Sequence, residues 1–375
     1  MEGVVDLSLE PERKRKAGVL LAATELYVAR DRHDTAEQRI FSELFRQLLP
    51  DAPVQHRRMI ASLLADYAHT PADCLSLLAA DADADVAARA LSSAGPLAET
   101  DLMTGAARGA ETVRRAIAGR SAMPAVVAQV LLRHADAETL KVLLARPDCP
   151  LDDEALAILA ARPQVLAALA PELASRRALP APLLFALFLD LDPAGRMEAI
   201  AAAEARALGE LARKGDPRVL NAAFKPAVLK SLVAAALSGG VAVFAAHLAY
   251  TLALSGDTAA RLVDDTGGEA LVVALRALGT GDSESGRILV RLLGQSVPLD
   301  RLRQLIALHD RITPRAAMLL VEGLRAGIPA SVVRPASGIA SPFGGIAHAD
   351  RREVGAPRQT GSGTNPLATG RRDVG

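Results

Sequence analysis

A helix-start signal recurs five times along the chain, and this period constrains the fold more than any other feature of the sequence. The starts lie at Thr70, Leu97, Met123, Leu151 and Leu179, which are 27, 26, 28 and 28 residues apart. Each start offers a proline for the first helical turn or acidic groups for the helix N-terminus, and an apolar run follows it. A period of this length is typical of stacked structural repeats.

A second apolar helix follows each of the first four starts. These second helices are expected around residues 85–91, 111–117, 138–144 and 163–169. Each unit is therefore a short antiparallel helix pair, and neither helix is long enough to be stable alone in water. Because stacking the pairs buries one continuous core, we predict an all-α fold built as an α-solenoid of HEAT-like helical hairpins.

The domain organisation follows from where this period holds. We expect N-terminal helices over residues 1–50 that pack on the solenoid, and HEAT-like repeats over 51–193. An irregular helical C-terminal half over 194–330 continues the solenoid as hairpins of unequal length. Gly, Pro, Ser, Thr, Ala and Arg dominate residues 331–375, which cannot bury enough apolar surface to offset their ordering entropy. This last segment is predicted to be a disordered C-terminal tail.

Helices in the irregular half are placed between Gly and Pro breakers. They are expected at 194–213, 217–223, 226–238, 241–255, 257–264, 268–278, 284–294, 298–309 and 314–326.

Residues 231–256 contain no Asp, Glu, Lys or Arg, and the stretch is long enough to span a bilayer. Gly239 and Gly240 interrupt it, and much of it is Ala, which gains little on insertion. The favoured interpretation is two buried core helices joined at the glycines, with His247 as a hydrogen-bonded core residue. A membrane-associated helical protein that uses 231–256 stays an alternative.

Motifs that would supply chemistry are incomplete. Asp81, Asp83 and Asp85 alternate as in a calcium loop, but Val86 and Ser92 stand where that loop needs Gly and Glu. The glycine spacing of residues 281–286 lacks the Lys and Ser/Thr of a phosphate-binding loop. The sequence therefore predicts no catalytic residues, no cofactor, no metal site and no enzyme.

The charge pattern favours a protein partner over a nucleic acid. The 43 basic residues balance 43 acidic ones, whereas phosphate neutralisation usually needs a basic face. Seven cations fall in the second to fourth helix pairs and are the candidate partner-binding residues: Arg114, Arg115, Arg120, Arg133, Lys141, Arg146 and Arg162. Equivalent repeat positions line up, so these side chains are expected to form a stripe that docks an acidic protein segment. An ordinary solvated face is the alternative.

The helix pairs resemble HEAT-type repeats. More narrowly, residues 36–280 resemble an α-proteobacterial family, domain of unknown function 2336. The segments that carry the resemblance are 71–80, 97–120, 123–147, 151–169 and the Ala-rich hairpin within 225–279. The resemblance implies a helical-repeat fold, and it implies neither a chemistry nor functional residues.

These features together favour a non-catalytic protein–protein interaction scaffold or regulator whose partner the sequence does not name. The apolar run after the basic cluster at residues 13–16 is interrupted by Glu25, which is unlike a signal peptide, so a cytoplasmic location is expected. Two alternatives stay open. One is a HEAT-like enzyme of the DNA glycosylase or chromophore lyase type, although a glycosylase would be expected to use Trp and the chain has none. The other is the membrane-associated protein described above.

Overall fold

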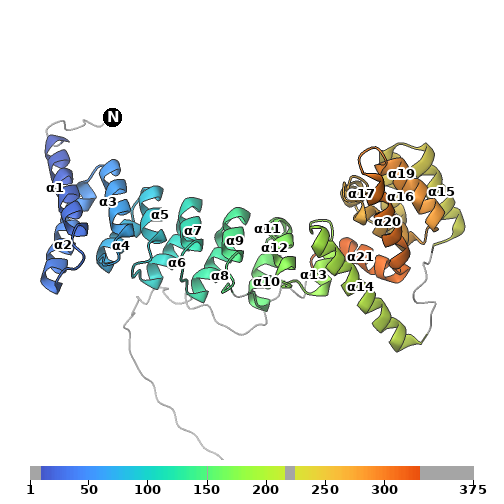
Figure 1. Ribbon diagram of the computed structural model, residues 1–375, viewed down its shortest axis with the longest axis horizontal. Coiled ribbons are helices and arrows are strands. Elements are labelled where there is room, and N and C mark those ends of the chain that lie inside the picture. Colours follow the sequence, from blue (N-terminus) through green and yellow to red (C-terminus); the bar gives the residue numbers. More distant parts are fainter. Residues whose placement is uncertain (1–9, 150, 216–223, 330–375) are drawn as a thin grey trace, which may run out of the picture. The chain divides into compact units, whose positions relative to one another are not determined.

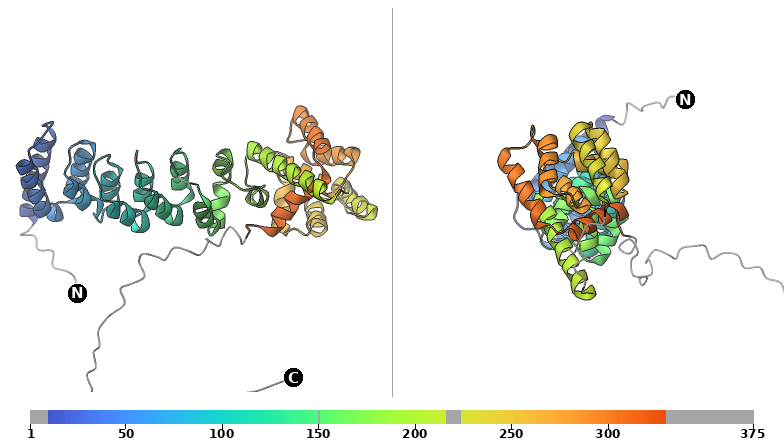
Figure 2. Two further views of the ribbon diagram at one scale, coloured as in Figure 1. Left: turned by 90° about the horizontal axis from the view of Figure 1, so that it is seen from below. Right: turned by 90° about the vertical axis from the view of Figure 1, so that its right-hand side faces the viewer.

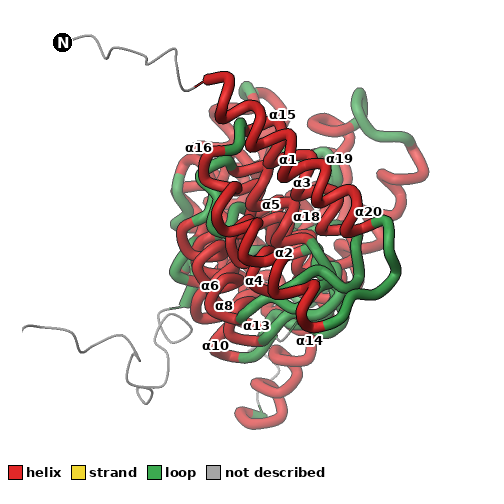
Figure 3. Tube along the Cα trace, turned by 90° about the vertical axis from the view of Figure 1, so that its left-hand side faces the viewer, coloured by secondary structure: helices red, strands yellow, loops and turns green. Residues whose placement is uncertain are grey.

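The computed structural model describes residues 10–149, 151–215 and 224–329, which all fall in one compact unit. These residues form helices and loops with no strand among them (Figure 3). The predicted all-α class is confirmed. The predicted disordered tail and the predicted helix at 217–223 lie outside the described residues.

The N-terminal helices and the repeats run from α1 to α13. Their bounds are α1 (Glu10–Val28), α2 (Thr35–Leu48), the 3-10 turn η1 (Leu49–Asp51), α3 (Val54–Asp66), α4 (Ala72–Ala79), α5 (Ala84–Ser92), α6 (Glu99–Arg108), α7 (Glu111–Ala118), α8 (Ala125–His134), α9 (Ala137–Leu144), α10 (Asp153–Ala160), α11 (Pro163–Ala168), α12 (Ala170–Ser175) and α13 (Ala181–Ala186).

Every predicted start opens a helix two residues later, at α4, α6, α8, α10 and α13. Side-chain caps and prolines mark the beginnings of the helices in these pairs. Asp83, Asp136 and Asp152 precede α5, α9 and α10, and each carboxylate accepts a hydrogen bond from a backbone N–H of the first turn. Pro71 and Pro124 hold extended backbone before α4 and α8, where the helix has no partner for its first N–H groups.

Successive pairs stack in two layers. The second helices α3, α5, α7 and α9 contact one another in order, and the first helices α2, α4, α6, α8 and α10 do the same. Figures 1 and 2 show these two rows side by side. A helix pair therefore meets its neighbours in sequence, and its outer faces stay exposed.

The C-terminal half runs from α14 to α21. Its helices are α14 (Pro193–Lys214), α15 (Pro226–Ser238), α16 (Val241–Leu252), α17 (Gly256–Val263), α18 (Glu269–Leu278), α19 (Asp282–Leu293), α20 (Leu299–Arg311) and α21 (Pro314–Ala326). All eight were expected within a few residues of these bounds.

This half differs from a simple continued stack because it is arranged around α18. Nine of the ten residues of α18 are buried, and α17, α19, α20 and α21 all contact it. A helix that is apolar on all sides must be covered on all sides. The last described helix, α21, also contacts α13 and α14, so it packs against the end of the repeats.

The buried apolar residues form two clusters. The smaller joins α1 to α5 and includes Phe45, Ile60 and Leu64, whereas the larger runs from α5 to α21. The clusters meet at α5, where Val86 belongs to the first and Leu91 to the second.

The uncharged stretch 231–256 forms α15 and α16, joined at Gly239 and Gly240 as expected. No described helix combines the length and the apolar character needed to cross a bilayer. The interpretation of two buried core helices is wrong, because α15 buries only Leu232 and Ala236 and the His247 side chain is exposed on α16. Only one side of α16, with Phe244 and Leu248, is covered by neighbouring helices.

Candidate functional site

Four of the seven predicted cations turn toward the backbone of neighbouring helices. Arg120 shows the pattern most fully. Its guanidinium donates to the carbonyl oxygen of Leu91 in the last turn of α5, at 2.9 Å, and to those of Ser93 and, at 3.4 Å, Gly95 just after the helix. The Leu91 carbonyl lies in the last turn, where the helix offers it no partner. Burial lowers the pKa of Arg120 below its ordinary value.

Arg162 and Arg114 do the same for two first helices. Arg162 donates to the carbonyl oxygens of Leu132 at 2.7 Å and Ala135 at 2.6 Å, at the end of α8. Arg114 donates to Ala106 at 2.9 Å, at the end of α6. A cation at this end also complements the helix dipole.

Arg146 divides its contacts. It forms two hydrogen bonds with the Asp148 carboxylate, at 3.0 and 2.6 Å, and one with the Ser121 carbonyl at 3.2 Å. Its position after α9 matches that of Arg120 after α7, so the expected alignment of these two arginines exists. Their guanidinium groups serve the contacts between repeats.

Arg176 continues this series and was not identified from the sequence. It donates to the carbonyl oxygens of Leu144 at 3.0 Å, Arg146 at 3.2 Å and Cys149 at 3.2 Å, after the end of α9. Like Arg120 and Arg146, it follows the last residue of a helix by one or two positions. That placement was the available signal.

Of the remaining three predicted cations, Arg115 and Arg133 are exposed, and Lys141 is half-buried with its side chain 38% exposed. Arg115 and Lys141 occupy equivalent positions of the adjacent helices α7 and α9. Each cation has a carboxylate partner: Asp136 lies 3.9 Å from Arg115, Glu154 lies 3.6 Å from Arg133, and Glu138 lies 3.0 Å from Lys141. Exposed pairs of this kind contribute little to stability and exchange readily with water or another partner. Of the seven predicted cations, these are the three whose charged groups pair only with surface carboxylates.

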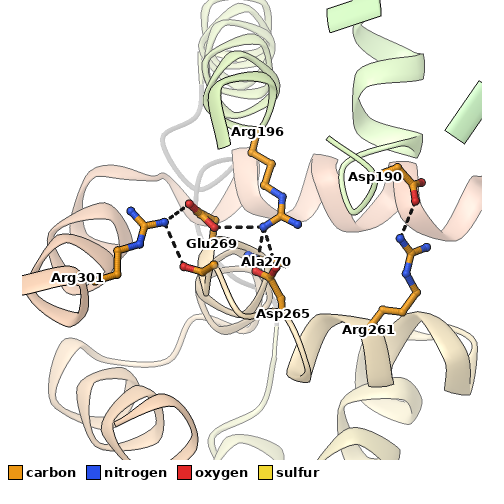
Figure 4. Close-up of polar contacts among 8 residues, drawn as sticks. Asp190, Arg196, Arg261, Asp265, Glu269, Ala270 and Arg301 are labelled. Carbon is orange, nitrogen blue, oxygen red and sulfur yellow. Dashed lines mark hydrogen bonds and ion pairs between the residues drawn. The ribbon is translucent and has the colours of Figure 1, made fainter. Parts of the chain in front are cut away.

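A buried ion cluster ties α14 to the helices around α18 (Figure 4). The Arg196 guanidinium lies 2.8 Å from the Asp265 carboxylate and 3.1 Å from that of Glu269. Arg301 on α20 pairs with the other Glu269 oxygen and donates to the Gly267 carbonyl at 3.1 Å. Charges buried this deeply are tolerated because each has a partner, and loss of one partner is costly.

A second polar cluster lies between α19 and α20. His309 is 1% exposed, and its Nε2 lies 2.9 Å from the Ser285 hydroxyl, which lies 2.7 Å from the Thr280 hydroxyl. Burial, aided by the charge of Arg276, lowers the pKa of His309 below its ordinary value. On the other side of the ring, Asp282 and Asp310 approach Nδ1 at 3.4 and 3.6 Å.

The outer face of α16 is apolar and exposed. Val243, His247 and Tyr250 are spaced as neighbours on one helix face, and Tyr250 is 90% exposed. Val241 adds a further exposed apolar side chain at the start of the helix. Exposed apolar groups that gather on one surface are typical of interaction sites.

A comparison with protein families agrees with the resemblance seen in the sequence and moves its limits. The sequence model of DUF2336, described as an uncharacterised protein conserved in bacteria, matches residues 86–322. The match begins later than residue 36 and continues past residue 280 through α19 and α20 into α21. Its span coincides with the larger core cluster, which runs from Ala87 to Val321. No curated protein and no solved structure matches the chain. Since the match covers more than half of its residues, the chain belongs to the DUF2336 family of bacterial proteins.

Proposed function

We propose that the chain is a non-catalytic, cytoplasmic scaffold that binds another protein through the outer face of α16. One observation carries this proposal: Tyr250 is 90% exposed at the end of a row that includes Val243 and His247. Tyr is enriched among the residues that dominate binding energy at protein interfaces, because a rigid ring buries a large area at low entropic cost.

The composition around this row favours a protein over a membrane surface. Helices that lie on membranes usually flank their apolar face with Lys and Arg, which attract anionic lipid headgroups. Residues 231–256 contain neither. A partner that offers an apolar pocket for Tyr250 fits this surface better than a bilayer does.

Arg115, Arg133 and Lys141 form the second surface of the proposal. Their exposed ion pairs leave the cations accessible, and acidic side chains of a partner would replace Asp136, Glu154 and Glu138. Such rim contacts mainly set association rate and specificity. We therefore assign affinity to the α16 face and selectivity for acidic partners to the cations.

Site-specific photo-crosslinking in the native cell tests the proposal. A photoreactive amino acid replaces Tyr250 in one variant and Leu299 in a matched control, since Leu299 is also an exposed apolar residue, 61% exposed on α20. The proposal expects a discrete protein adduct from position 250 and none from position 299. The protein found in that adduct should bind the purified wild-type chain. The Tyr250→Ser variant should bind it at least about tenfold more weakly, which corresponds to a modest interface hot spot.

Two results would overturn the proposal. One is the lack of any adduct at position 250, or the same adducts at both positions. The other is that the purified chain floats with phosphatidylcholine vesicles and that Tyr250→Ser abolishes this flotation. In that case α16 would be a membrane contact.

A further inference from the structure

The His309 ring has one nitrogen with a defined hydrogen bond and one without. Nε2 lies 2.9 Å from the Ser285 hydroxyl, whereas Nδ1 is buried and has no hydrogen-bond partner among the described residues. A buried nitrogen without a partner is costly, since it has lost its water and gained nothing in return.

The hydrogen-bond chain at Nε2 determines which nitrogen carries the proton. The Leu275 carbonyl can only accept, so the Thr280 hydroxyl donates to it at 2.9 Å. Thr280 then accepts from Ser285 at 2.7 Å, and Ser285 accepts from the His309 Nε2–H. This is the one direction in which all three contacts contain a hydrogen, because each hydroxyl has a single proton to donate. In the neutral imidazole, Nδ1 is therefore the nitrogen with a free lone pair.

This lone pair faces two carboxylates. An Asp282 oxygen lies 3.4 Å from Nδ1 and an Asp310 oxygen lies 3.6 Å from it, and one ligand atom of each of the three residues lies within 4.8 Å of the others. Three electron-rich atoms that converge without a hydrogen between them repel one another, and a cation placed between them removes the repulsion.

We propose that His309, Asp282 and Asp310 bind a divalent transition-metal ion, with Zn²⁺ the best fit. Zinc binds imidazole nitrogen and carboxylate oxygen at about 2.0–2.2 Å, so two ligands of a tetrahedral site lie about 3.4 Å apart. The two distances from Nδ1 match this separation. Calcium and magnesium prefer sites made only of oxygen ligands, so the imidazole argues against both.

The surroundings of the site fit the same assignment. The bond from Nε2–H to Ser285 is the outer contact that a metal-binding histidine usually makes, and it fixes the orientation of the ring. Asp282 and Asp310 are 68% and 51% exposed, which leaves the solvent side of the site open. Asp282 also lines a shallow hollow of about 510 Å³ between α15 and α19, of which His309 and Asp310 form no part.

Calorimetric titration of the purified full chain with ZnCl₂ at neutral pH tests the site. We expect one saturable ion per chain. The double variant Asp282→Asn, Asp310→Asn should lose more than about 100-fold in affinity, because loss of a direct ligand costs more than the 10–100-fold typical of outer contacts. Both aspartates are exposed, so this variant is expected to fold. Ser285→Ala, which removes only the outer contact, should lose about tenfold.

Asp300→Asn is the matched control, because Asp300 is an exposed aspartate on the same helix as His309 and Asp310. It should bind Zn²⁺ as the wild type does. Titration with Co²⁺ gives an independent readout, since a tetrahedral site of nitrogen and oxygen ligands produces visible absorption that the double variant should lack. Equal Zn²⁺ affinity of the wild type and the double variant, or no saturable binding by the wild type, would overturn the proposal.

Discussion

At the scale of single residues, the arginines that follow helix ends join one repeat to the next. A helix leaves its last carbonyl oxygens without internal partners, and in a stacked pair the adjacent repeat limits the access of water to them. Arg120 and Arg176 donate to carbonyl oxygens in the last turn of a helix and in the segment just after it, each from about one repeat further along the chain. Their cationic character therefore serves the fold before it serves any partner.

Substitution of Arg120 tests this role. Arg120→Ala should lower the free energy of unfolding by about 2 kcal/mol, because the carbonyls of Leu91 and Ser93 lose a charged donor while remaining partly buried. Arg115→Ala is the control and should change stability by less than about 0.5 kcal/mol, since its ion pair is long and exposed. Urea unfolding of both variants measures the difference. Equal effects would show that Arg120 is no more structural than Arg115.

The sequence identified these cations but could not say what they touch. Arg120 and its acceptors are separated by 25 to 29 residues, and the contact depends on how two helix pairs stack. The same limit applies to His309, whose carboxylate partner Asp282 lies on another helix. Neither spacing matches a local ligand pattern, so the sequence predicted no metal site.

At the scale of elements, the approach of α21 to α13 depends on one glycine. A Cβ added at Gly323 would lie 2.3 Å from the Phe185 Cβ and 2.8 Å from the Phe185 carbonyl carbon, so any side chain there must push the helices apart. In addition to α13, α21 contacts α14 and α18.

A matched pair of glycine substitutions tests this crossing. Gly323→Ala should destabilise the fold by about 1–3 kcal/mol through overpacking. Gly209→Ala on α14 meets nothing within 4 Å and should stabilise by about 0.5–1 kcal/mol, because alanine favours the helix. Thermal unfolding of the two variants decides the point, and a stabilising Gly323→Ala would contradict the described crossing.

The contact between α14 and α21 makes stability depend on pH. Arg315 donates to the Glu210 carboxylate at 2.9 and 3.3 Å and holds the pKa of Glu210 below its ordinary value of 4.5. A carboxyl group whose pKa is lowered by folding adds stability above its unfolded pKa, and this stability is lost as the pH falls through the folded pKa.

Comparison of the wild type with Glu210→Gln isolates this effect. The variant should be less stable by about 1 kcal/mol at pH 7, the size of one partly buried hydrogen-bonded pair. The difference should shrink steadily as the pH falls below 4.5. Melting temperatures from pH 7 to pH 3 provide the measurement. A difference that stays constant through that range would remove the Arg315 contact as its cause.

The sequence predicted where the helices begin and end better than it predicted which side of each helix is buried. Starts and breakers are local, so the bounds of α4 to α10 follow from prolines, capping acids and glycines. The burial of α16 does not follow, because an Ala-rich helix without charges gives no polar face to mark the solvent side. His247 was therefore assigned to the core, although neighbouring helices cover only the side with Phe244 and Leu248.

At the scale of the molecule, each helix pair of the stack shares its buried apolar residues with the pairs next to it. The smaller cluster around Phe45 and the larger cluster around α18 meet at α4 and α5, and the family match begins in α5, at residue 86. In stacked repeats, stability is a sum over pairs and their interfaces, so one end of the stack can open while the other stays folded. The repeat period of the sequence predicted the stack of helix pairs. It could not predict how helices assemble around α18, because those contacts join residues that lie far apart in the sequence and do not repeat.

Hydrogen exchange of the Phe45→Ala variant, followed by mass spectrometry, is the most direct test of an interior shared only between neighbouring pairs. Phe45 is fully buried in the smaller cluster, and its truncation should cost about 3–5 kcal/mol there. We predict faster exchange in α1 to α4 and unchanged exchange in α18 to α21. Equal acceleration of exchange in every helix would show one cooperative core and would contradict the account.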